Sequence, residues 1–392
     1  MNDQYQKGTK AIWAGEDNIN TKGAATTPIV SSVAFSYNDL EEWYDVATGK
    51  AEGYIYSRNT NPTVASLEEK IRVLEGAEAA TSFSTGMAAI SNTLFTFLTA
   101  GKRVVSIKDS YGGTSKLFLD FLPKYNVDVE LCETTDHEAI EAAVAKGCDV
   151  LYLETPTNPT LKIVDIARLA KAAKAVGAVV MVDNTFATPI NQNPLQLGAD
   201  LVLHSATKYL CGHSDAMGGL LAGKKELVQK VFQFREINGA SLQADPAYMI
   251  ARGMKTLELR IERQNASALK IAQYLKAHDK IKDVFYPGLS SHKGHDIAAK
   301  QMRGFGGMMS FSLNGGWESV RKFLPSLKLV HLAASLGSVS TLAGPPRTTS
   351  HVELTEAQRQ QLGIPEGLIR YSTGIENVDD LLDDIESALK MI

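Results

Sequence analysis

Apolar runs alternate with helix-like patterns through the middle of the chain. The runs are short and strand-like, and the stretches between them repeat their apolar residues with helical spacing. The patterns predict strands at 103–107, 127–131, 150–153, 179–182 and 201–203, and helices at 63–74, 136–145 and 165–175. Strands that alternate with helices at this spacing are typical of α/β proteins. We therefore predict a mostly parallel sheet with helices on both faces.

The pattern changes near residue 60 and again near residue 260. The first 60 residues have little periodicity and many turn residues, so they bury little by themselves and are expected to pack on a neighbouring subunit. After residue 260 a long helical pattern leads to short strand-like pieces and a closing amphipathic helix. These elements are a helix at 260–277, strands at 307–313, 328–332 and 368–372, and a helix at 378–391. We predict an N-terminal arm (1–60), a large α/β domain (61–259) and a smaller α+β domain (260–392).

Composition narrows the class of protein. The chain of 392 residues is 44% hydrophobic and 21% charged, which is ordinary for a globular protein. A net charge of −4 without a basic patch argues against nucleic acid and anionic membranes as partners. No apolar run approaches the roughly 20 residues of a membrane span, and the first residues lack the apolar core of a signal peptide. Cys132, Cys148 and Cys211 are too scattered for a disulfide framework or a CxxC site. We expect a soluble, cytoplasmic protein.

The most informative stretch is 200–215. The predicted strand 201–203 leads directly to Ser205, Thr207 and Lys208. A lysine placed after a buried strand and beside two hydroxyls suits a Schiff base with an aldehyde cofactor whose phosphate needs hydroxyl donors. The alternative is a surface lysine in a polar loop.

A carboxylate ends the strand before it. Asp183 follows the predicted strand 179–182. Ligands of open α/β sheets bind outside the carboxyl ends of the strands, so Asp183 and Lys208 are expected to face one crevice. Pyridoxal 5′-phosphate (PLP) needs a lysine for its imine and an Asp that keeps its pyridine nitrogen protonated. The alternative for Asp183 is a helix N-cap or a loop residue.

Two further motifs supply groups for a bound phosphate. Small residues at 84–90 predict a helix N-terminus, whose free N–H groups and dipole favour an anion, and Gly86 lets the backbone approach it closely. Simple helix capping is the commoner alternative. Tyr56 and Arg58 lie two apart in the N-terminal arm and point the same way if the segment is extended. They would bind a phosphate, or they belong to a solvated loop.

Three residues are candidates for contacts to the cofactor ring and the substrate. Tyr111 follows the predicted strand 103–107 and would stack on a flat ring or relay protons, unless it is only a turn residue. Asn158 lies in a proline-rich turn and would donate to the cofactor's phenolic oxygen, or serve the turn alone. Arg370, on a predicted strand, needs a carboxylate, either from a substrate or from an internal salt bridge.

Together these motifs resemble the Cys/Met-metabolism PLP enzymes, a family that includes cystathionine γ-synthase, cystathionine γ-lyase, methionine γ-lyase and O-acetylhomoserine sulfhydrylase. The resemblance covers essentially the whole chain. The matching motifs are Tyr56-Ser-Arg58 with Asn61-Pro-Thr63, Ser84-Thr-Gly-Met87, Tyr111-Gly-Gly-Thr114, Glu154-Thr-Pro-Thr-Asn-Pro159, Val182-Asp-Asn-Thr185, Ser205-Ala-Thr-Lys-Tyr209, Ser335-Leu-Gly337 and Arg370. The resemblance implies PLP-dependent fold type I, like aspartate aminotransferase, and a homotetramer built from two tight dimers.

The resemblance also implies a role for each candidate. Lys208 would hold PLP and carry protons between the α- and β-carbons of an amino-acid substrate, and Tyr111 would assist the leaving group. The implied cofactor contacts are Tyr56 and Arg58 of the neighbouring subunit, Gly86, Met87, Tyr111, Asp183, Ser205, Thr207 and Lys208. The implied substrate contacts are Asn158, Ser335 and Arg370. No metal is implied.

The implied chemistry is γ-replacement or γ-elimination on an activated homoserine or a homocysteine-type thioether. Gly113 stands where methionine γ-lyases usually carry Cys, which argues against a dedicated methionine lyase, and Ser340 stands where cystathionine-handling members usually carry Glu. Arg347 departs from a usual His-Pro-Ala and would meet an acidic leaving group or be solvated. Cys211 replaces a usual Asn, and we expect it to pack in the core. We expect an enzyme like cystathionine γ-synthase, with a γ-lyase or O-acetylhomoserine sulfhydrylase as the alternative and a non-catalytic PLP-fold binding protein as a remote one.

Overall fold

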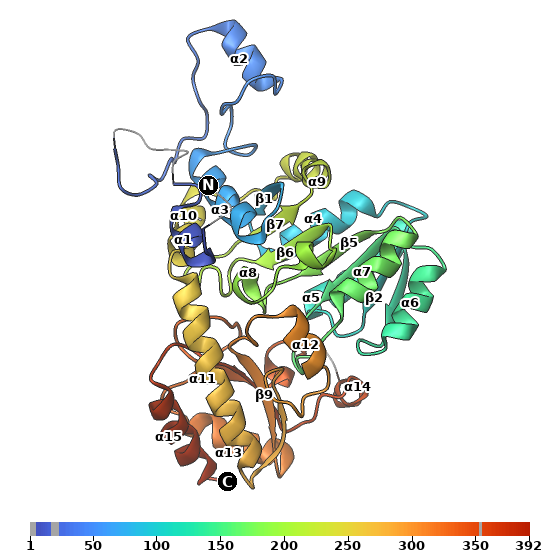
Figure 1. Ribbon diagram of the computed structural model, residues 1–392, viewed down its shortest axis with the longest axis vertical. Helices are drawn as coiled ribbons and strands as arrows, with labels where there is room; N and C mark the ends of the chain where they lie inside the picture. Colours follow the sequence, from blue (N-terminus) through green and yellow to red (C-terminus); the bar gives the residue numbers. More distant parts are fainter. Residues whose placement is uncertain (1–4, 17–22, 353–354) are drawn as a thin grey trace.

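The computed structural model of the protein describes residues 5–16, 23–352 and 355–392. It contains two sheets, each covered by helices, and an N-terminal segment that projects from them (Figure 1). Residues 1–4 and 17–22 of the predicted arm lie outside the described residues. Within the described ranges, no helix combines the length and the apolar character needed to cross a membrane.

The larger sheet has seven strands in the order β1-β7-β6-β5-β4-β2-β3. Its strands are β1 (Ala79–Phe83), β2 (Arg103–Ile107), β3 (Asp128–Cys132), β4 (Val150–Glu154), β5 (Val179–Asp183), β6 (Leu201–Ser205) and β7 (Gly219–Gly223). All neighbours pair in parallel except β7, which is antiparallel to both β1 and β6. The predicted mostly parallel sheet is confirmed, and the two strands that the pattern missed are the neighbours β1 and β7.

Alternating side chains of this sheet face two helical layers. Val105 on β2 packs towards α6 (His137–Ala145) and α7 (Ile166–Ala175). Its neighbour Val104 packs towards α4 (Gly86–Phe97) and α9 (Lys225–Asn238) on the other face. Both valines are fully buried. Asp136 and Asp165 cap α6 and α7 through their side chains, which explains why the predicted helices begin there.

The smaller sheet has five strands in the order β10-β11-β12-β9-β8. They are β8 (Ile281–Phe285), β9 (Met308–Leu313), β10 (His331–Leu332), β11 (Leu342–Gly344) and β12 (Leu368–Ser372). The strand predicted at 328–332 is therefore shorter than expected. Three helices, α11 (Leu257–Ala277), α13 (Gly316–Ser326) and α15 (Val378–Leu389), pack against this sheet in one core. Because α11 runs unbroken across residue 260, the boundary between the two predicted domains stays a prediction.

The remaining helices complete the two parts of the fold. They are α3 (Pro62–Glu75), α5 (Gly112–Lys116), α8 (Thr188–Asn191), α10 (Ala244–Met254), α12 (His295–Gln301) and α14 (Glu356–Gln361), a π-helix (Leu117–Phe121), and 3-10 turns at Leu122–Tyr125, Pro194–Leu197 and Pro346–Thr348.

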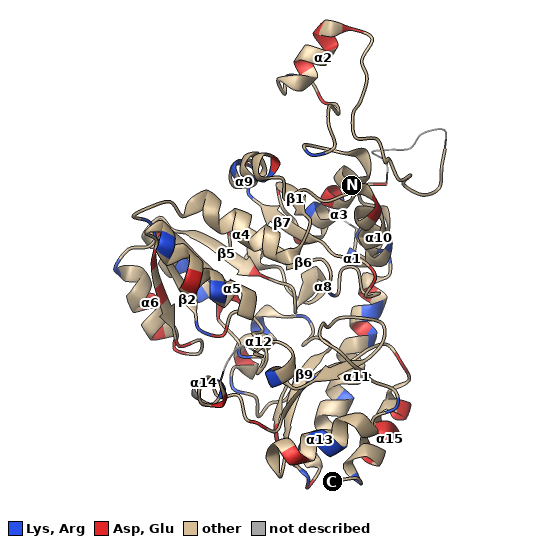
Figure 2. Ribbon diagram, turned by 180° about the vertical axis from the view of Figure 1, so that it is seen from behind, with Lys and Arg blue, Asp and Glu red and all other residues tan. Residues whose placement is uncertain are grey.

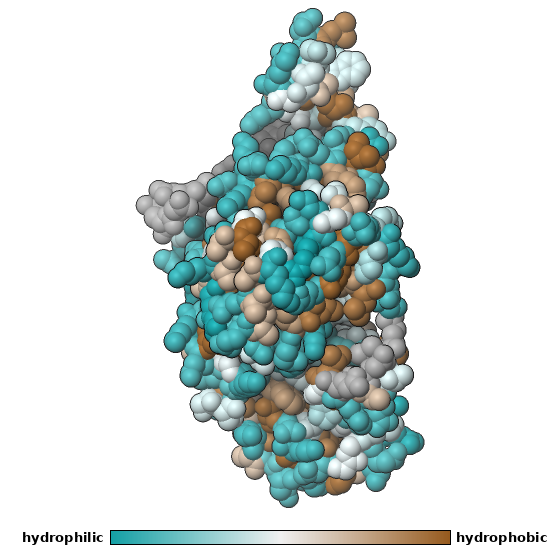
Figure 3. All heavy atoms as spheres, turned by 90° about the vertical axis from the view of Figure 1, so that its right-hand side faces the viewer, coloured by the Kyte–Doolittle hydropathy of each residue, from teal (hydrophilic) through white to brown (hydrophobic). Residues whose placement is uncertain are grey.

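The predicted arm contains two helices that the sequence pattern did not indicate. The first, α1 (Lys7–Trp13), is docked on the body, where the buried Lys70 amine donates to the carbonyls of Ala11 and Ile12 at 2.9 and 3.0 Å. The second, α2 (Leu40–Ala47), stands away from both sheets (Figure 1), carries acidic residues (Figure 2) and buries none of its side chains. Apolar residues lie open along this projection (Figure 3), among them Leu40, which is 77% exposed. The segment around α2 thus buries little by itself, as expected, and its contact with a neighbouring subunit stays a prediction.

Gly219 lets β7 approach the N-terminus of α4. A Cβ atom at this position would overlap the carbonyl group of Thr85 and lie 2.9 Å from Cβ of Ala89. We therefore expect Gly219→Ala to lower the free energy of unfolding by about 1–3 kcal/mol, because the backbone of Thr85 has to move. Chemical denaturation followed by circular dichroism measures this change. An unchanged denaturation midpoint would contradict the close packing of β7 on α4.

Candidate active site

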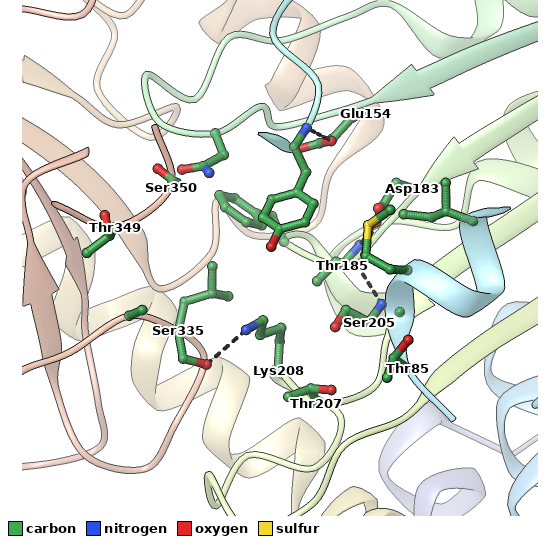
Figure 4. A pocket seen from close by; sticks show the side chains of 18 of the residues that line it. Thr85, Glu154, Asp183, Thr185, Ser205, Thr207, Lys208, Ser335, Thr349 and Ser350 are labelled. Carbon is green, nitrogen blue, oxygen red and sulfur yellow. Dashed lines mark hydrogen bonds between the residues drawn. The ribbon is translucent and has the colours of Figure 1, made fainter. Parts of the chain in front are cut away.

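The carboxyl ends of β4, β5 and β6 face a pocket that also receives residues from the smaller sheet (Figure 4). Its volume is 290 Å³. Ten of the residues proposed from the sequence line it: Gly86, Met87, Tyr111, Asn158, Asp183, Ser205, Thr207, Lys208, Ser335 and Arg370. The structure therefore brings together residues that lie up to 284 positions apart, from 86 to 370, which were proposed from strand ends, a helix start and the family resemblance.

Lys208 lies in the turn after β6, half-buried, with its amine in the pocket. Its Nζ donates to Oγ of Ser335 at 2.9 Å. Burial, and then the positive charge of Arg370, lower the pKa of Lys208 to about 8. Ser335 has a φ of +111°, which is a strained backbone conformation for a residue with a side chain. It adopts this conformation where its hydroxyl accepts the hydrogen bond from Lys208. Lys208 is therefore not the surface lysine of the alternative interpretation.

Two carboxylates lie side by side at the strand ends. Asp183 on β5 is paired in register with Glu154 on β4, and both are buried. Burial raises the pKa of Asp183, and burial followed by the charge of Asp183 raises the pKa of Glu154 well above its usual range. Oδ1 of Asp183 accepts from N and Oγ1 of Thr185 at 3.0 and 2.5 Å. Asp183 therefore also forms a local turn contact, as a loop residue would. Among the described residues, no cation forms an ion pair with either carboxylate.

One end of the pocket is built to receive an anion. Helix α4 begins at Gly86, as predicted, and Thr85 caps it by accepting from N of Ala88 at 3.0 Å. The N–H groups of the first turn of a helix have no intrahelical acceptors. A Cβ at Gly86 would lie 2.7 Å from Cβ of Ser205, so glycine allows this hydroxyl to sit against the helix start. Thr207 adds a second hydroxyl at the same wall (Figure 4).

Arg370 lies on β12 and is 7% exposed. Its guanidinium donates to Oδ1 of Asn158 at 3.2 Å and to the carbonyl of Ser335 at 2.9 Å. No carboxylate of the described residues pairs with it, so the internal salt bridge considered from the sequence is wrong. Burial lowers the pKa of Arg370 to about 10, and the guanidinium stays charged at neutral pH. A buried cation without an anion, at the wall of a pocket, is suited to a ligand carboxylate.

Tyr111 lies just before α5, and its N–H donates to Oε2 of Glu154 at 2.8 Å. The residue is 45% exposed, and its side chain lines the pocket. Gly113 makes this arrangement possible, because a Cβ there would lie 2.8 Å from Sδ of Met87 and 3.0 Å from Cε1 of Tyr111. The ring is free to stack on a flat ligand.

Other lining residues were not proposed from the sequence. Glu154 and Thr185 sit at the ends of β4 and β5, so the strand-end argument, applied to every strand, would have found them. Thr349 and Ser350 follow a 3-10 turn and reach the pocket from the smaller sheet (Figure 4). No motif or periodicity marks these two, because only the packing of the sheets brings them there.

Tyr56 and Arg58 lie at the base of the projecting segment and do not line this pocket. The guanidinium carbon of Arg58 is 5.5 Å from the ring centre of Tyr56, so the two side chains do point the same way. Both are exposed. Within the described part of the chain the Arg58 guanidinium has no hydrogen bond or ion pair.

Two departures from the expected pattern have structural explanations. Arg347 forms a 2.9 Å ion pair with Glu366, and its guanidinium carbon lies 4.1 Å from the ring centre of Trp317, while its side chain stays 35% exposed. Cys211 is fully buried in the core, as expected, and its Sγ lies 3.2 Å from Oδ1 of Asp215.

The Cys/Met metabolism PLP-dependent enzyme family matches this chain from residue 8 to residue 390. The chain belongs to this family. L-methionine γ-lyase of Fusobacterium nucleatum subsp. polymorphum is 44% identical to it, over 99% of both chains. Cystathionine γ-lyase of Bacillus subtilis (strain 168) is 41% identical, over 99% of this chain and 100% of its own. Structures of cystathionine γ-synthase from Xanthomonas oryzae pv. oryzae, one with cystathionine and one with aminoacrylate and cysteine, have a TM-score of 0.94 at 39% identity, over 99% of this chain and 98% of theirs.

These similarities confirm three predictions. The chain is a PLP-dependent enzyme of the family, its architecture is fold type I, and its cofactor is PLP. The relatives carry different activities, so the reaction that this member catalyses is not decided by them.

The pocket fits PLP on observations of its own. Asp183 is a buried carboxylate without a cation, which suits a protonated pyridine nitrogen. The start of α4 with Ser205 and Thr207 suits a phosphate. Lys208 is an amine with a lowered pKa, which suits an aldehyde. These residues would hold the nitrogen, phosphate and aldehyde ends of the cofactor.

The lowered pKa of Lys208 makes cofactor capture depend on pH. The neutral amine is the nucleophile, so the rate at which the cofactor-free enzyme takes up PLP should rise as pH increases through about 8 and then level off. Arg370→Met removes a neighbouring positive charge and should move this midpoint upward. Stopped-flow absorbance measures the rate, and a lysine peptide mixed with PLP corrects for titration of the cofactor. A midpoint near the ordinary lysine value of about 10.4 in the unmodified protein would contradict the burial of the amine.

Proposed function

We propose that this enzyme joins an activated homoserine to a thiol amino acid by γ-replacement, as a cystathionine γ-synthase does. The observation that carries the proposal over a methionine lyase is a second cavity, of 750 Å³, which shares residues such as Thr207 and Ser335 with the active-site pocket. Its lining includes the polar side chains of Asp215, His331 and Ser340 and also apolar ones such as those of Met217, Leu332 and Leu342. A second amino acid brings an ammonium and a carboxylate, and this cavity offers it polar groups beside the reacting carbon. The methyl end of methionine needs no such groups.

The residues around the pocket support distinct tasks. Bound PLP supplies the electron sink that stabilises negative charge at the substrate's α-carbon. Arg370, oriented by Asn158, holds the substrate carboxylate. Lys208 would take the proton from the α-carbon, release it within the cofactor-bound substrate, and then take a proton from the β-carbon so that the γ-substituent can leave with its bonding electrons. Its lowered pKa favours the neutral amine that removes each proton. Tyr111 assists the leaving group from its place over the pocket. Ser335 keeps the Lys208 amine on the substrate side.

Elimination is the second candidate. The 44% identity to an L-methionine γ-lyase favours it. Gly113 argues against methionine as the main substrate, because Met87 and Tyr111 occupy the space that a larger residue at this position would need. A γ-lyase that acts on cystathionine uses the same distal groups as the synthase, so the two reactions are separated by the fate of the intermediate chain and not by the shape of the cavity.

Product analysis separates these activities. We expect cystathionine from O-succinylhomoserine and cysteine, and slower release of 2-oxobutanoate from O-succinylhomoserine alone. Turnover of methionine should be at least about tenfold slower, because the distal polar groups gain no partner. Chromatography of the products and a keto-acid assay measure these rates, with Lys208→Ala as the inactive control. Rapid formation of 2-oxobutanoate from cystathionine without a thiol would assign a γ-lyase instead.

We also propose that the enzyme is a homotetramer built from two tight dimers, in which each arm completes the site of its partner. Three observations support this. The helix α2 and its flanking chain expose large apolar side chains, including Val33, Trp43 and Tyr44. The Arg58 guanidinium is exposed beside Tyr56 and lies apart from its own pocket. The phosphate end of that pocket contains hydroxyl and N–H donors, and the two cations that line the pocket, Lys208 and Arg370, donate to Ser335 and, for Arg370, to Asn158.

Mixed dimers test the shared site. Arg58→Ala should weaken PLP retention, because a charged contact to the phosphate is lost. Co-expression with a Lys208→Ala chain, each carrying a different affinity tag, gives hybrid dimers in which one site has both Lys208 and an intact partner arm. These hybrids should recover the visible absorption of bound PLP after dialysis. Absence of recovery in purified hybrids would argue against a site shared between subunits.

A further inference from the structure

We infer that Arg235 is the residue that positions the arm for its partner's cofactor site, an inference that rests on the shared site proposed above. Arg235 lies on α9, on the body of the protein, and is 2% exposed. Its guanidinium lies between the edge strand β1 and the backbone of the arm. It is a positioning residue, because it contacts neither its own pocket nor the projecting side chain of Arg58.

On the arm side, Arg235 contacts the backbone directly after the residues proposed to reach the partner. Its Nη2 donates to the carbonyl oxygen of Asn59. The carbonyl oxygen of Arg58 lies 3.4 Å from the same nitrogen. The adjacent Glu236 accepts from Nδ2 of Asn59 at 2.6 Å. Two consecutive residues of α9 therefore hold residues 58 and 59 by their main chain and one amide. The Arg58 guanidinium takes no part in this contact and remains exposed.

On the body side, Arg235 is fixed to the first strand of the large sheet. Its Nη1 donates to the carbonyl of Ser82 at 3.0 Å and to Oγ1 of Thr81 at 3.1 Å, and it lies 3.4 Å from Oε1 of Glu68. The same Glu68 oxygen accepts from N and Oγ of Ser82 at 2.8 and 2.7 Å. A buried guanidinium with partners on both sides fixes their separation, because its donors are rigid and planar.

The arm beyond this point has few other ties. Residues 33–35 and 55–57 pair through single backbone bonds, including N of Phe35 to the carbonyl of Ile55 at 3.1 Å and N of Ser57 to that of Val33 at 2.8 Å. The helix α2 lies beyond them and buries none of its side chains. The base of the arm is also joined to the start of α3, where Nδ2 of Asn61 donates to Oγ of Ser57 at 3.0 Å and to the carbonyl of Val30 at 2.9 Å. The contacts at residues 58 and 59 are those that join the segment carrying Tyr56 and Arg58 to α9. A hydrogen bond from Arg58 to a phosphate tolerates only a few tenths of an ångström in distance, so the anchor has to be rigid.

Arg235→Met keeps the length of the side chain and removes its donors. We expect PLP to leave this variant about tenfold faster on dialysis, the factor that loss of a charge-assisted hydrogen bond represents. The matched control is Lys230→Gln on the same helix, which removes an exposed charge paired with Glu226 and touches no part of the arm. The control should retain PLP like the unmodified enzyme. Gel filtration and circular dichroism establish that both variants are folded and assembled.

Hybrid dimers test whether Arg235 acts by positioning the arm or only by supporting the large sheet of its own chain. A hybrid of Arg235→Met with Lys208→Ala has one site in which Lys208 comes from the Arg235→Met chain and the arm comes from the chain with an intact Arg235. If Arg235 acts through its arm, that site should retain PLP, measured by the visible absorption of the cofactor bound to Lys208. If Arg235 only supports its own large sheet, the site should lose PLP as fast as the Arg235→Met homodimer.

The hybrid of Arg58→Ala with Lys208→Ala is made in parallel. Recovery in both hybrids supports the inference. Recovery with Arg58→Ala but not with Arg235→Met overturns it and leaves the shared site standing, and recovery with neither overturns both. If Arg235→Met does not fold because the buried Glu68 is left unpaired, the double variant Glu68→Gln/Arg235→Met removes both charges and enters the same comparison.

Discussion

Buried charges without internal partners govern the active site. Asp183 lacks a cation among the described residues, and Arg370 lacks a carboxylate. Burying an unpaired charge is costly, so these groups persist only because neighbouring polar groups hold them and a ligand completes them. The register of β4 and β5 places Glu154 next to Asp183, which raises the pKa of Glu154 further. The pocket walls therefore carry a carboxylate and a guanidinium that have no ion pair among the described residues and that a bound ligand can complete.

The backbone around the pocket is strained or closely packed where the unpaired groups are held. Ser335 keeps a positive φ where it accepts from Lys208 and where its carbonyl accepts from Arg370. Gly86 and Gly113 leave room for Ser205 and for the ring of Tyr111. Each of these contacts brings the amine, the phosphate donors and the aromatic ring into one small volume. The arm extends this arrangement outward, because its base is held by α9 while its side chains stay exposed.

Strand ends were the most informative feature of the sequence. The runs at 103–107 and 368–372 have the same bounds as β2 and β12, and those that end near Glu154, Asp183 and Ser205 lie within two residues of the observed strand ends. In the larger sheet the missed strands β1 and β7 are the pair that involves the antiparallel strand, and β7 is short and begins and ends with glycine. In the smaller sheet the pattern missed β8 and β11. The glycines of β7 are present because α4 and β6 approach closely, and a periodicity argument cannot register this. Thr349 and Ser350 were missed for a similar reason, since only packing of the smaller sheet carries them to the pocket.

The sequence by itself determined the α/β class, the family, the cofactor and the ten residues that meet at the pocket, because hydrophobic periodicity and ordered motifs are local properties of the chain. The tertiary structure decided what is not local. It paired Arg347 with Glu366 and Trp317, left Arg370 without a carboxylate, and attached the base of the arm to Arg235. Charge pairing depends on which side chains share a buried volume, and residues far apart in sequence come to share one only when the sheets and helices have packed.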